Sequence, residues 1–140
     1  MIFQTTLDDT EELVQFLEPF MTQVHQTEYK PKVVYDGIRN CLATGEFSFI
    51  SVQDNIIRGV FLGMLVHNPL MNKNMLQEVV WYAKDNSGYS LLKAAINAAR
   101  LHEVDYFHHT MIEPVDPRAH KLLTKRIGFS PLERSYLMKL

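Results

Sequence analysis

Apolar side chains recur every three or four positions between Leu13 and Val24, which is the spacing that places them on one face of an α-helix. Acidic residues precede this stretch, where the positive end of a helix dipole favours them. The pattern predicts a helix over residues 9–28. Pro19 lies inside it and removes one backbone hydrogen bond, so we expect either a kink there or two shorter helices.

Runs of strand-favouring and apolar residues predict strands in the middle of the chain, after a second short helix over residues 32–42. Asp54 and Asn55 are typical of a two-residue hairpin turn. The segment 67–74, which contains asparagine and proline, is predicted to be a loop. The strands expected from this pattern span residues 47–52, 56–67 and 75–84.

Helix and strand patterns then alternate towards the C-terminus. Residues 89–103 carry apolar side chains on one helical face, and residues 105–112 have the pattern of another strand. Asp116 is placed to cap a further helix that stops at Gly128, and a closing strand is expected after it. This order, with a short strand at the N-terminus, predicts one α/β (α+β) domain over residues 1–140. Its central mixed, mostly antiparallel sheet would be flanked by helices.

Composition narrows the class of protein further. The chain has 140 residues, of which 46% are hydrophobic and 21% charged, so it can bury a core without disulfide or metal. Its 14 basic and 16 acidic residues give a net charge of −2, which argues against a binder of nucleic acid or of a membrane surface. A single cysteine, no zinc-like Cys/His spacing and no secretory signal fit a cytoplasmic protein without a metal.

Two segments carry a resemblance to a known family. The strand–turn–helix over residues 78–95 and the later segment 116–129, which ends in Gly128-Phe129, resemble the cofactor segment and the penultimate helix of the GNAT family of N-acetyltransferases. The order of elements is similar to that family over nearly the whole chain. The resemblance implies acetyl-CoA as co-substrate, an amine as acceptor and a GNAT-like fold. Compact members with few motif residues are familiar among bacteriophage products, so the resemblance also fits a phage-infected host cell.

The resemblance implies a site for the pyrophosphate of acetyl-CoA at the start of the helix near Gly88. Backbone N–H groups at a helix N-terminus are unpaired and suit an anion. The family pattern has Gln or Arg, two residues, Gly, one residue, and Gly or Ala; this chain keeps one glycine, Gly88, and lacks the Gln or Arg. The preceding strand end would bind the pantetheine arm. The residues expected to bind the co-substrate are Trp81, Tyr82, Ala83, Lys84, Asn86, Ser87, Gly88, Tyr89 and Ser90.

Acetyl transfer needs a base for the amine, a donor to the thioester oxygen and an acid for the thiolate. The resemblance places Glu78 as the general base and a backbone N–H near Trp81 or Tyr82 as the donor. The family's tyrosine acid is missing at its usual position, and Tyr136 is the candidate substitute. His108 and its neighbour His109 point to opposite faces of a strand, and His108 is a further candidate base or proton relay.

Each of these side chains also has a purely structural interpretation, as a packed or solvated residue of the sheet. Two functions therefore remain open. One is an N-acetyltransferase acting on an amine. The other is a catalytically inactive GNAT-like protein that binds a macromolecular partner. The degenerate loop favours the second, whereas Glu78 and the Gly128-Phe129 ending favour the first. A homodimer is compatible with either.

Overall fold

The computed structural model describes residues 1–25, 29–111, 116–132, 138 and 140. They form two compact units, Met1–His109 and Thr110–Leu140, and each is described by itself. The expected end of the first helix and most of the closing strand, including Tyr136, lie outside the described residues.

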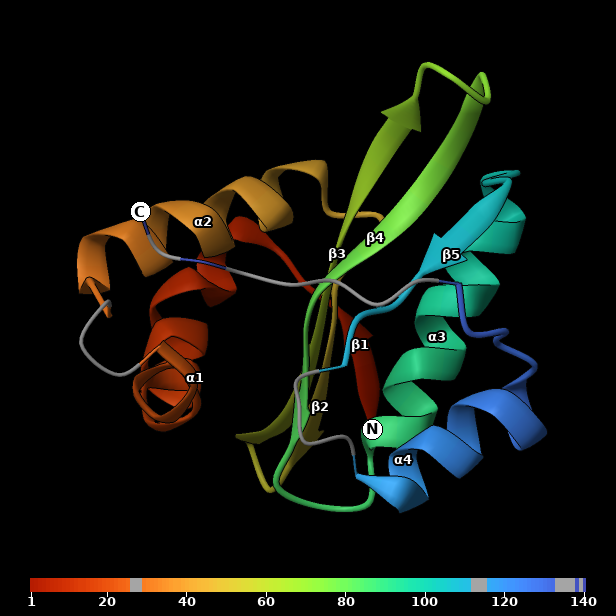
Figure 1. Cartoon of the computed structure of the whole chain (residues 1–140). Helices are drawn as coiled ribbons and strands as arrows, with labels where there is room; N and C mark the ends of the chain where they lie inside the picture. The colour runs from red at the N-terminus through yellow and green to blue at the C-terminus, as the bar shows by residue number, and fades with distance from the viewer. Residues whose placement is uncertain (26–28, 112–115, 133–137, 139) are drawn as a thin grey trace. The chain divides into compact units, whose positions relative to one another are not determined.

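The first unit contains one five-stranded sheet in the order β1-β2-β3-β4-β5 (Figure 1). Neighbouring strands from β1 to β4 are antiparallel, and β4 and β5 are parallel. The predicted mixed, mostly antiparallel sheet is therefore confirmed. The strands are β1 Ile2–Gln4, β2 Phe49–Gln53, β3 Ile56–Asn68, β4 Lys73–Ala83 and β5 Tyr106–His108.

Helices cover both faces of this sheet. Figure 1 shows α1, Thr10–His25, and α2, Pro31–Thr44, on one side, and α3, Gly88–Leu101, on the other. A short 3-10 helix, η1, Leu7–Asp9, precedes α1. One apolar cluster fills the space between the sheet and the helices α1 and α2, and it forms the main core of the unit. Its buried members are Leu13, Phe16, Leu17, Ile38, Cys41, Leu42, Ile50, Ile57, Val60, Leu62 and Val80.

Of the two outcomes expected at Pro19, the division into two shorter helices is wrong, because α1 is a single helix from Thr10 to His25. The apolar face of the helix explains its continuity. Leu13 and Leu17 are fully buried against the sheet and α2. Packing of this kind supplies most of the stability of a helix in a protein, and it offsets the hydrogen bond lost at Pro19.

Of the two predicted connections between strands, the hairpin turn is confirmed and the longer loop is not. Asp54 and Asn55 both have positive φ, 52° and 60°, as a two-residue hairpin turn requires. The predicted loop over 67–74 is wrong in extent, because β3 and β4 continue into it and leave only a four-residue connection. The side chain of Asn68 explains this, since its Oδ1 accepts hydrogen bonds from two backbone N–H groups of the turn.

The last strand of the first unit is shorter than the predicted 105–112. Only Tyr106–His108 is strand, paired with Met75, Leu76 and Gln77 of β4. Phe107 lies on the α3 side of the sheet, since its ring centroid is 5.6 Å from that of Phe61. Phe61 shares a strand face with Gly59, whose added Cβ would meet Leu91 of α3.

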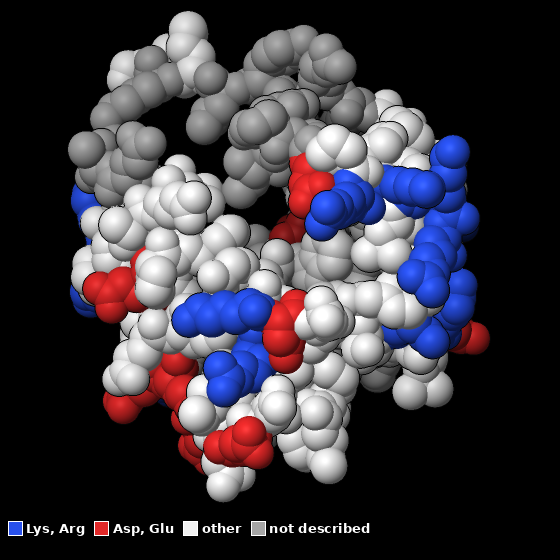
Figure 2. All heavy atoms as spheres, turned by 90° about the horizontal axis from the view of Figure 1, so that it is seen from below, with Lys and Arg blue, Asp and Glu red and all other residues white. Residues whose placement is uncertain are grey.

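The second unit begins with α4, Pro117–Lys121, which continues directly into a π-helix, η3, Leu122–Ile127. Asp116 Oδ1 accepts a hydrogen bond from the Arg118 N–H at 2.8 Å, and Gly128, with φ 102°, follows the last turn. Both predicted ends are confirmed. Residues 117–132 include four Lys or Arg residues and no acidic residue. In Figure 2, most Lys and Arg side chains lie towards the right of the picture.

Candidate functional site

The candidate site lies where β4 extends beyond the end of β5, the strand parallel to it. The register of β4 and β5 pairs Gln77 with His108 and, among the described residues, goes no further. β4 itself continues to Ala83 and leads into the turn before α3. A stretch of β4 therefore keeps its β3 partner while its other edge has no strand beside it in the first unit.

The β4–β5 register brings two pairs of side chains together on opposite faces of the sheet. His108 Nδ1 is 2.5 Å from Gln77 Oε1 on one face. The next residues on each strand, Glu78 and His109, must point to the other face, because successive side chains of a strand alternate. That face is the one covered by α3, since Phe107 lies on it two residues before His109.

Glu78 and His109 form a close and buried pair. His109 Nδ1 is 3.2 Å from Glu78 Oε2, and the two side chains are 5% and 9% exposed, respectively. The Trp81 ring meets the His109 ring edge to face, with centroids 5.2 Å apart and planes at 77°. At this distance the carboxylate attracts the imidazole whenever the ring is protonated, but the contact does not have the geometry of a hydrogen bond.

A β-bulge explains how Trp81 joins this pair. The β3–β4 register pairs Leu62 with Val80 but Gly63 with Glu78, so Val79 is an extra residue in β4. In a regular strand, residues three apart, such as Glu78 and Trp81, would point to opposite faces. The extra residue between them brings both side chains to the face of His109.

The backbone of β4 beyond the bulge presents polar groups at its open edge. The Lys84 N–H donates a 2.8 Å hydrogen bond to the Arg58 carbonyl on β3. Because backbone groups alternate along a strand, the N–H of Tyr82 also points to β3, whereas those of Trp81 and Ala83 point to the opposite edge. Of the two residues suggested by the sequence as donors to a thioester oxygen, Trp81 is the one with the required direction.

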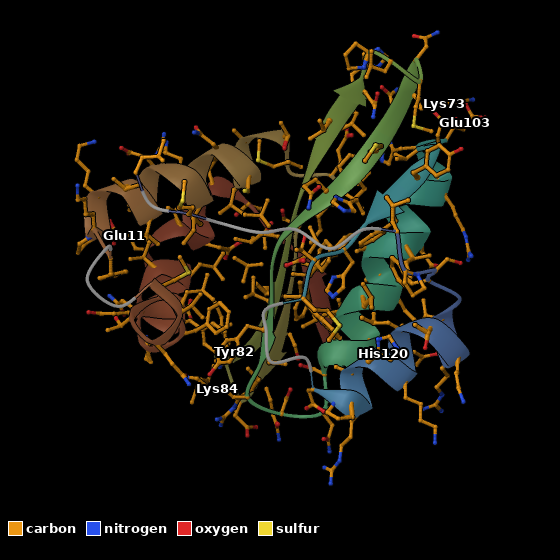
Figure 3. All side chains as sticks on the ribbon, viewed as in Figure 1. Glu11, Lys73, Tyr82, Lys84, Glu103 and His120 are labelled. Carbon is orange, nitrogen blue, oxygen red and sulfur yellow. The ribbon has the colours of Figure 1, made fainter. Side chains whose placement is uncertain are left out.

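The side chains of the predicted co-substrate strand divide between the two faces. Trp81 lies on the α3 side, where its Nε1 donates a 2.9 Å hydrogen bond to the Gly88 carbonyl. Tyr82 and Lys84 point towards α1 (Figure 3). Tyr82 stacks on Phe20 with centroids 4.7 Å apart, and Lys84 Nζ lies 4.7 Å from the centre of the Phe16 ring. The structure thus brings Trp81 to the helix start and takes Tyr82 and Lys84 away from it.

The start of α3 sits close against β3. A Cβ added at Gly59 would lie 2.7 Å from Ser87 Oγ and 2.8 Å from Leu91 Cδ1, so only glycine allows this approach. The first backbone N–H groups of an α-helix have no acceptor within the helix. Asp85 Oδ1 accepts that of Ser87 at 2.8 Å. The Ser87 side chain, then its backbone N–H and the Arg58 charge, lower the pKa of Asp85 below its ordinary value.

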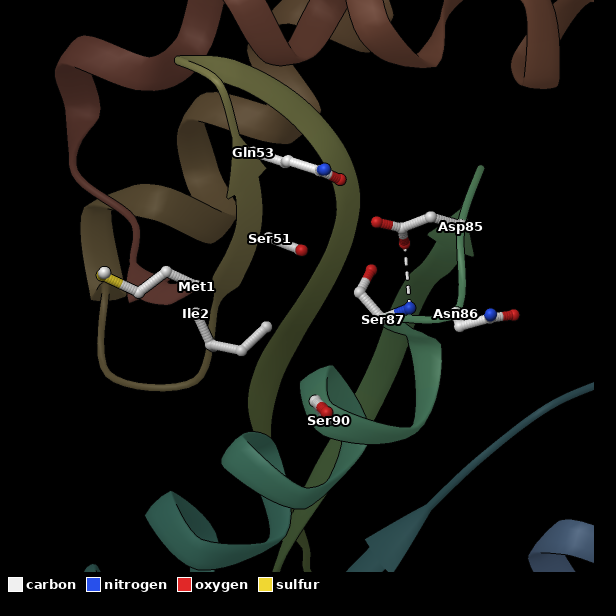
Figure 4. Close-up of a pocket in the computed structure, with 8 residues that line it drawn as sticks. All are labelled: Met1, Ile2, Ser51, Gln53, Asp85, Asn86, Ser87 and Ser90. Atoms are coloured by element: carbon white, nitrogen blue, oxygen red, sulfur yellow. Dashed lines mark hydrogen bonds between the residues drawn. The ribbon is translucent and has the colours of Figure 1, made fainter.

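A shallow cavity of about 480 Å³ opens beside this turn (Figure 4). It lies on the β1–β2 side of the α3 N-terminus, not beside β5, so it does not coincide with the open edge of β4. Asn86, Ser87 and Ser90, three of the predicted co-substrate residues, line it. The complete lining is Met1, Ile2, Ser51, Gln53, Asp85, Asn86, Ser87 and Ser90.

The turn before α3 fits a diphosphate in part. The helix start offers N–H groups, and the Arg58 Nε is buried with no hydrogen bond within the described part of the chain. The positive charge of Arg58 is close enough to help lower the pKa of Asp85. Asp85 works in the opposite direction, since its carboxylate already occupies one N–H and repels another anion.

Other chemistries find little support in the described residues. Across residues 1–25, 29–111 and 116–132 no group of three or more His, Cys, Asp or Glu side chains could hold a metal ion. Cys41 is buried in the core, and burial raises the pKa of its thiol, which makes it a poor nucleophile. Among the helices that the structure describes, none has the length and apolar character needed to cross a membrane.

Comparison with known proteins places the fold. No protein-family model and no curated protein matches the chain. A predicted acetyltransferase with acetyl-CoA from Clostridium acetobutylicum matches 99% of this chain and 95% of its own, at 14% identity and a TM-score of 0.77. The ribosomal-protein-alanine N-acetyltransferase from Brucella melitensis biovar Abortus 2308 matches 100% and 98%, at 13% identity and a TM-score of 0.71. An aminoglycoside acetyltransferase from an uncultured soil metagenomic sample, in complex with sisomicin, matches 100% of this chain and 96% of its own, at 15% identity and a TM-score of 0.73.

These matches span nearly the full length of both chains, and they define the class: the chain has the fold of an acetyltransferase. More particularly, it is the GNAT-like fold that the sequence resemblance predicted, and that prediction is confirmed at the level of the fold. At identities of this size the likeness concerns the fold and leaves chemistry to the residues themselves.

Sequence reasoning selected some site residues and missed another. The structure brings the predicted Glu78 and Trp81 together, but it adds His109 in place of His108, which lies on the opposite face with Gln77. Strand alternation already separated the two histidines. The register of β5 against β4, which decides which histidine meets Glu78, depends on pairing between distant segments and carries no local signal.

Proposed function

We propose that the protein is an N-acetyltransferase that moves the acetyl group of acetyl-CoA to a primary amine. The observation that carries this proposal is the open edge of β4 beside the buried Glu78–His109 pair. A thioester laid along that edge would have backbone donors on one side and an acid–base pair next to them. These are the groups that acyl transfer to an amine requires.

Each residue of the site has a defined part in this proposal. The pair of Glu78 and His109 accepts the proton of the amine. The backbone N–H of Trp81 polarises the thioester oxygen as that oxygen gains negative charge. The α3 N-terminus, with Arg58, holds the diphosphate. When bound, acetyl-CoA supplies the acetyl group as an activated thioester. Tyr136, the candidate acid for the thiolate, lies outside the described residues and stays a prediction.

One observation favours the alternative, an inactive GNAT-like protein that binds a macromolecular partner. The Asp85 carboxylate holds the Ser87 N–H at the position proposed for the diphosphate. A permanent negative charge there weakens the binding of any anion by like-charge repulsion. The two functions therefore differ first in whether the protein binds acetyl-CoA at all.

Thermal unfolding with and without acetyl-CoA tests the proposal. A ligand that binds only the native state raises Tm by mass action, so millimolar acetyl-CoA is expected to raise it by several degrees. Gly88→Glu is expected to abolish the rise, because it adds bulk and negative charge at the first turn of α3. Gly88→Ala is the matched control, since its Cβ would lie at an ordinary 3.5 Å from the Trp81 ring.

Release of free thiol with a panel of primary amines then separates the two functions. Binding accompanied by amine-dependent thiol release supports the transferase. A Tm that does not respond to acetyl-CoA contradicts it and leaves the binding-protein alternative. Binding without release from any amine of the panel, which includes an aminoglycoside and an N-terminal alanine peptide, counts against catalysis but not against the site.

A further inference from the structure

We propose that two copies of this chain associate through the outer edge of β3, the edge that faces away from β4. Residues 64–68 of each copy pair antiparallel about a two-fold axis at Val66. The proposal goes beyond the transferase function and does not depend on it. The sheet order places this edge on the opposite side of the β3–β4 pair from the open edge of β4.

β3 is longer than the strand that covers its outer edge. β2 pairs with β3 only as far as Phe61, whereas β3 continues to Asn68. Figure 1 shows β3 and β4 continuing together beyond β2 as a hairpin. Among the described residues, no strand lies beside the outer edge of residues 64–68. This stretch of β3 is therefore an edge strand that is paired on one side only.

The backbone groups at this edge have a defined direction. The Gly63 N–H points outward, since it donates a 3.4 Å hydrogen bond to Ser48 Oγ, directly before β2. Because backbone groups alternate along a strand, the N–H and C=O groups of Leu65 and His67 also point outward. Those of the residues between them pair with β4. Within the described part of the chain, the outward groups of Leu65 and His67 form no hydrogen bond.

Apolar side chains flank this edge on both faces of the sheet. Met64 and Val66 are 37% and 44% exposed, and they lie on the face of α1 and α2 because they alternate in step with the core residue Leu62. Leu65 is 47% exposed and points to the opposite face. A strand added at this edge would therefore cover apolar surface on both of its faces.

The edge also lacks the features that prevent pairing with another strand. Edge strands usually carry charges, a proline or a bulge for this purpose. The sequence has no Lys, Arg, Asp or Glu from residue 59 to residue 72. Pro69 lies beyond the last residue of β3, and both register shifts of this strand precede Met64. Residues 64–68 are thus open to a further strand.

A second copy of the chain fits this edge better than a charged peptide does. An antiparallel edge is complementary to itself, because its alternating donors and acceptors meet after a two-fold rotation. Two copies of an uncharged segment do not repel each other, whereas a charged peptide would find no opposite charge there. The contact uses the same surface on both copies, so assembly stops at two chains.

The free segment is centred on Val66, and this sets the expected register. Val66 faces Val66 of the second copy, and Leu65 exchanges N–H···O=C hydrogen bonds with His67 of the second copy. Gly63 takes no part, because its N–H is already bound to Ser48. The two sheets then become one continuous sheet across the axis.

The wild-type protein tests the proposal without any substitution. Sedimentation velocity between about 1 µM and about 100 µM is expected to show conversion from one chain to two. Over the same range, amide hydrogen exchange at Leu65 and His67 is expected to slow by about tenfold or more. A single chain at the higher concentration, a species larger than two chains, or unchanged exchange at these two amides overturns the proposal.

Opposite charges at Val66 test the register. Val66→Lys and Val66→Glu each bring two like charges together at the axis, so each variant alone is expected to stay a single chain. A mixture of the two is expected to restore the two-chain species, because unlike charges then meet. Val33→Lys, at a 64% exposed valine of α2, is the matched control and is expected to associate like the wild type. Association of either Val66 variant alone, or none in the mixture, overturns the proposal.

A further variant separates loss of pairing from loss of the fold. Leu65→Pro removes an outward N–H and no hydrogen bond within the chain, which an edge strand tolerates. It is expected to keep the circular dichroism of the wild type and to stay a single chain. Association of the folded Leu65→Pro variant at wild-type strength overturns the proposal. If a Val66 variant does not fold, hydrogen exchange in the wild type still decides.

Discussion

Two glycines of the chain show how differently the same residue can be constrained. Gly37 lies in the middle of α2, and a Cβ built on it would meet no atom within 4 Å. Gly63 lies in β3 opposite Glu78, and its Cβ would be 2.7 Å from Leu76 Cδ1 and 3.0 Å from the Phe47 carbonyl oxygen. Space is available at the first position, while backbone and core atoms occupy it at the second.

Alanine at these positions is expected to have opposite effects on stability. Gly37→Ala should raise the free energy of unfolding by about 0.5–1 kcal/mol, because it reduces the entropy of the unfolded chain and favours helix. Gly63→Ala should lower it by about 1–3 kcal/mol, because the core cannot make room for the added methyl group without strain. Urea unfolding of both variants measures this. Equal effects of the same sign would contradict the geometry.

At the scale of single residues, the sequence predicts chemistry better than it predicts contacts. Glu78 and Trp81 were selected from the strand pattern and the resemblance, and both lie in the site. His109 could not be selected over His108, because the choice depends on the strand register. Arg58 was not considered at all, since nothing in a linear pattern connects a bulge residue of β3 with a turn that follows β4.

At the scale of elements, α1 contains an unresolved conflict between local preference and packing. Pro19 is exposed and lies inside a continuous helix, so the Gln15 carbonyl lacks its usual donor four residues on. Pro19→Ala is expected to raise the free energy of unfolding by about 1–3 kcal/mol, since the restored hydrogen bond outweighs the greater freedom of the unfolded chain.

Equilibrium unfolding in urea measures the effect of Pro19→Ala. Gln15→Ala, at an exposed position of the same helix, is the matched control and is expected to change stability by less than about 0.5 kcal/mol. A lower stability for Pro19→Ala would mean that the proline is an adapted part of the helix.

Turns and helix ends that depend on local residues were predicted correctly, whereas the lengths of the strands were predicted less accurately. The two-residue turn at Asp54-Asn55, the cap at Asp116 and the stop at Gly128 are all local, and all are found. The extension of β3 and β4 through 67–74 was missed, because pairing with a neighbouring strand overrides the preference of asparagine for loops. β5 ends early for the same reason, since pairing and not sequence limits it.

For the whole molecule, the carboxylates of Asp85 and Asp105 make the free energy of unfolding depend on pH in the acidic range. Asp105 accepts hydrogen bonds from the Asn74 N–H and from Lys73, and these contacts lower its pKa, as Ser87 does for Asp85. A lowered pKa in the folded state means that the unfolded chain binds protons first as the pH falls. The stabilisation by both groups is therefore complete above about pH 4 and is lost below it.

We expect the urea midpoint of the wild type to fall between pH 6 and pH 3 by more than that of the double variant Asp85→Asn, Asp105→Asn. Asparagine keeps an oxygen acceptor at both positions but cannot gain a proton, so it removes the pH dependence and leaves the contacts. Unfolding in urea at a series of pH values measures the difference. Parallel curves for the two proteins would show that neither carboxylate carries the acid sensitivity.

The fold as a whole was predictable because the order of its elements is distinctive, whereas the site was only partly so. Order alone identified a mixed sheet between helices, and a solved structure with 13% identity shares it over nearly the full length of both chains. Chemistry depends on a few side chains meeting across segments that are distant in sequence. The loop before α3 keeps only one glycine of the family pattern, Gly88, and in the structure Arg58 and Asp85 bring opposite charges to it.

The bulge at Val79 sets a counting rule for this strand. Inserting one amino acid between Glu78 and Trp81 while the bulge is kept would turn one of the two side chains to the opposite face, away from His109. Deleting Val79 would instead remove the bulge and leave both side chains on one face. The segment should therefore tolerate loss of the bulge residue better than it tolerates an added one.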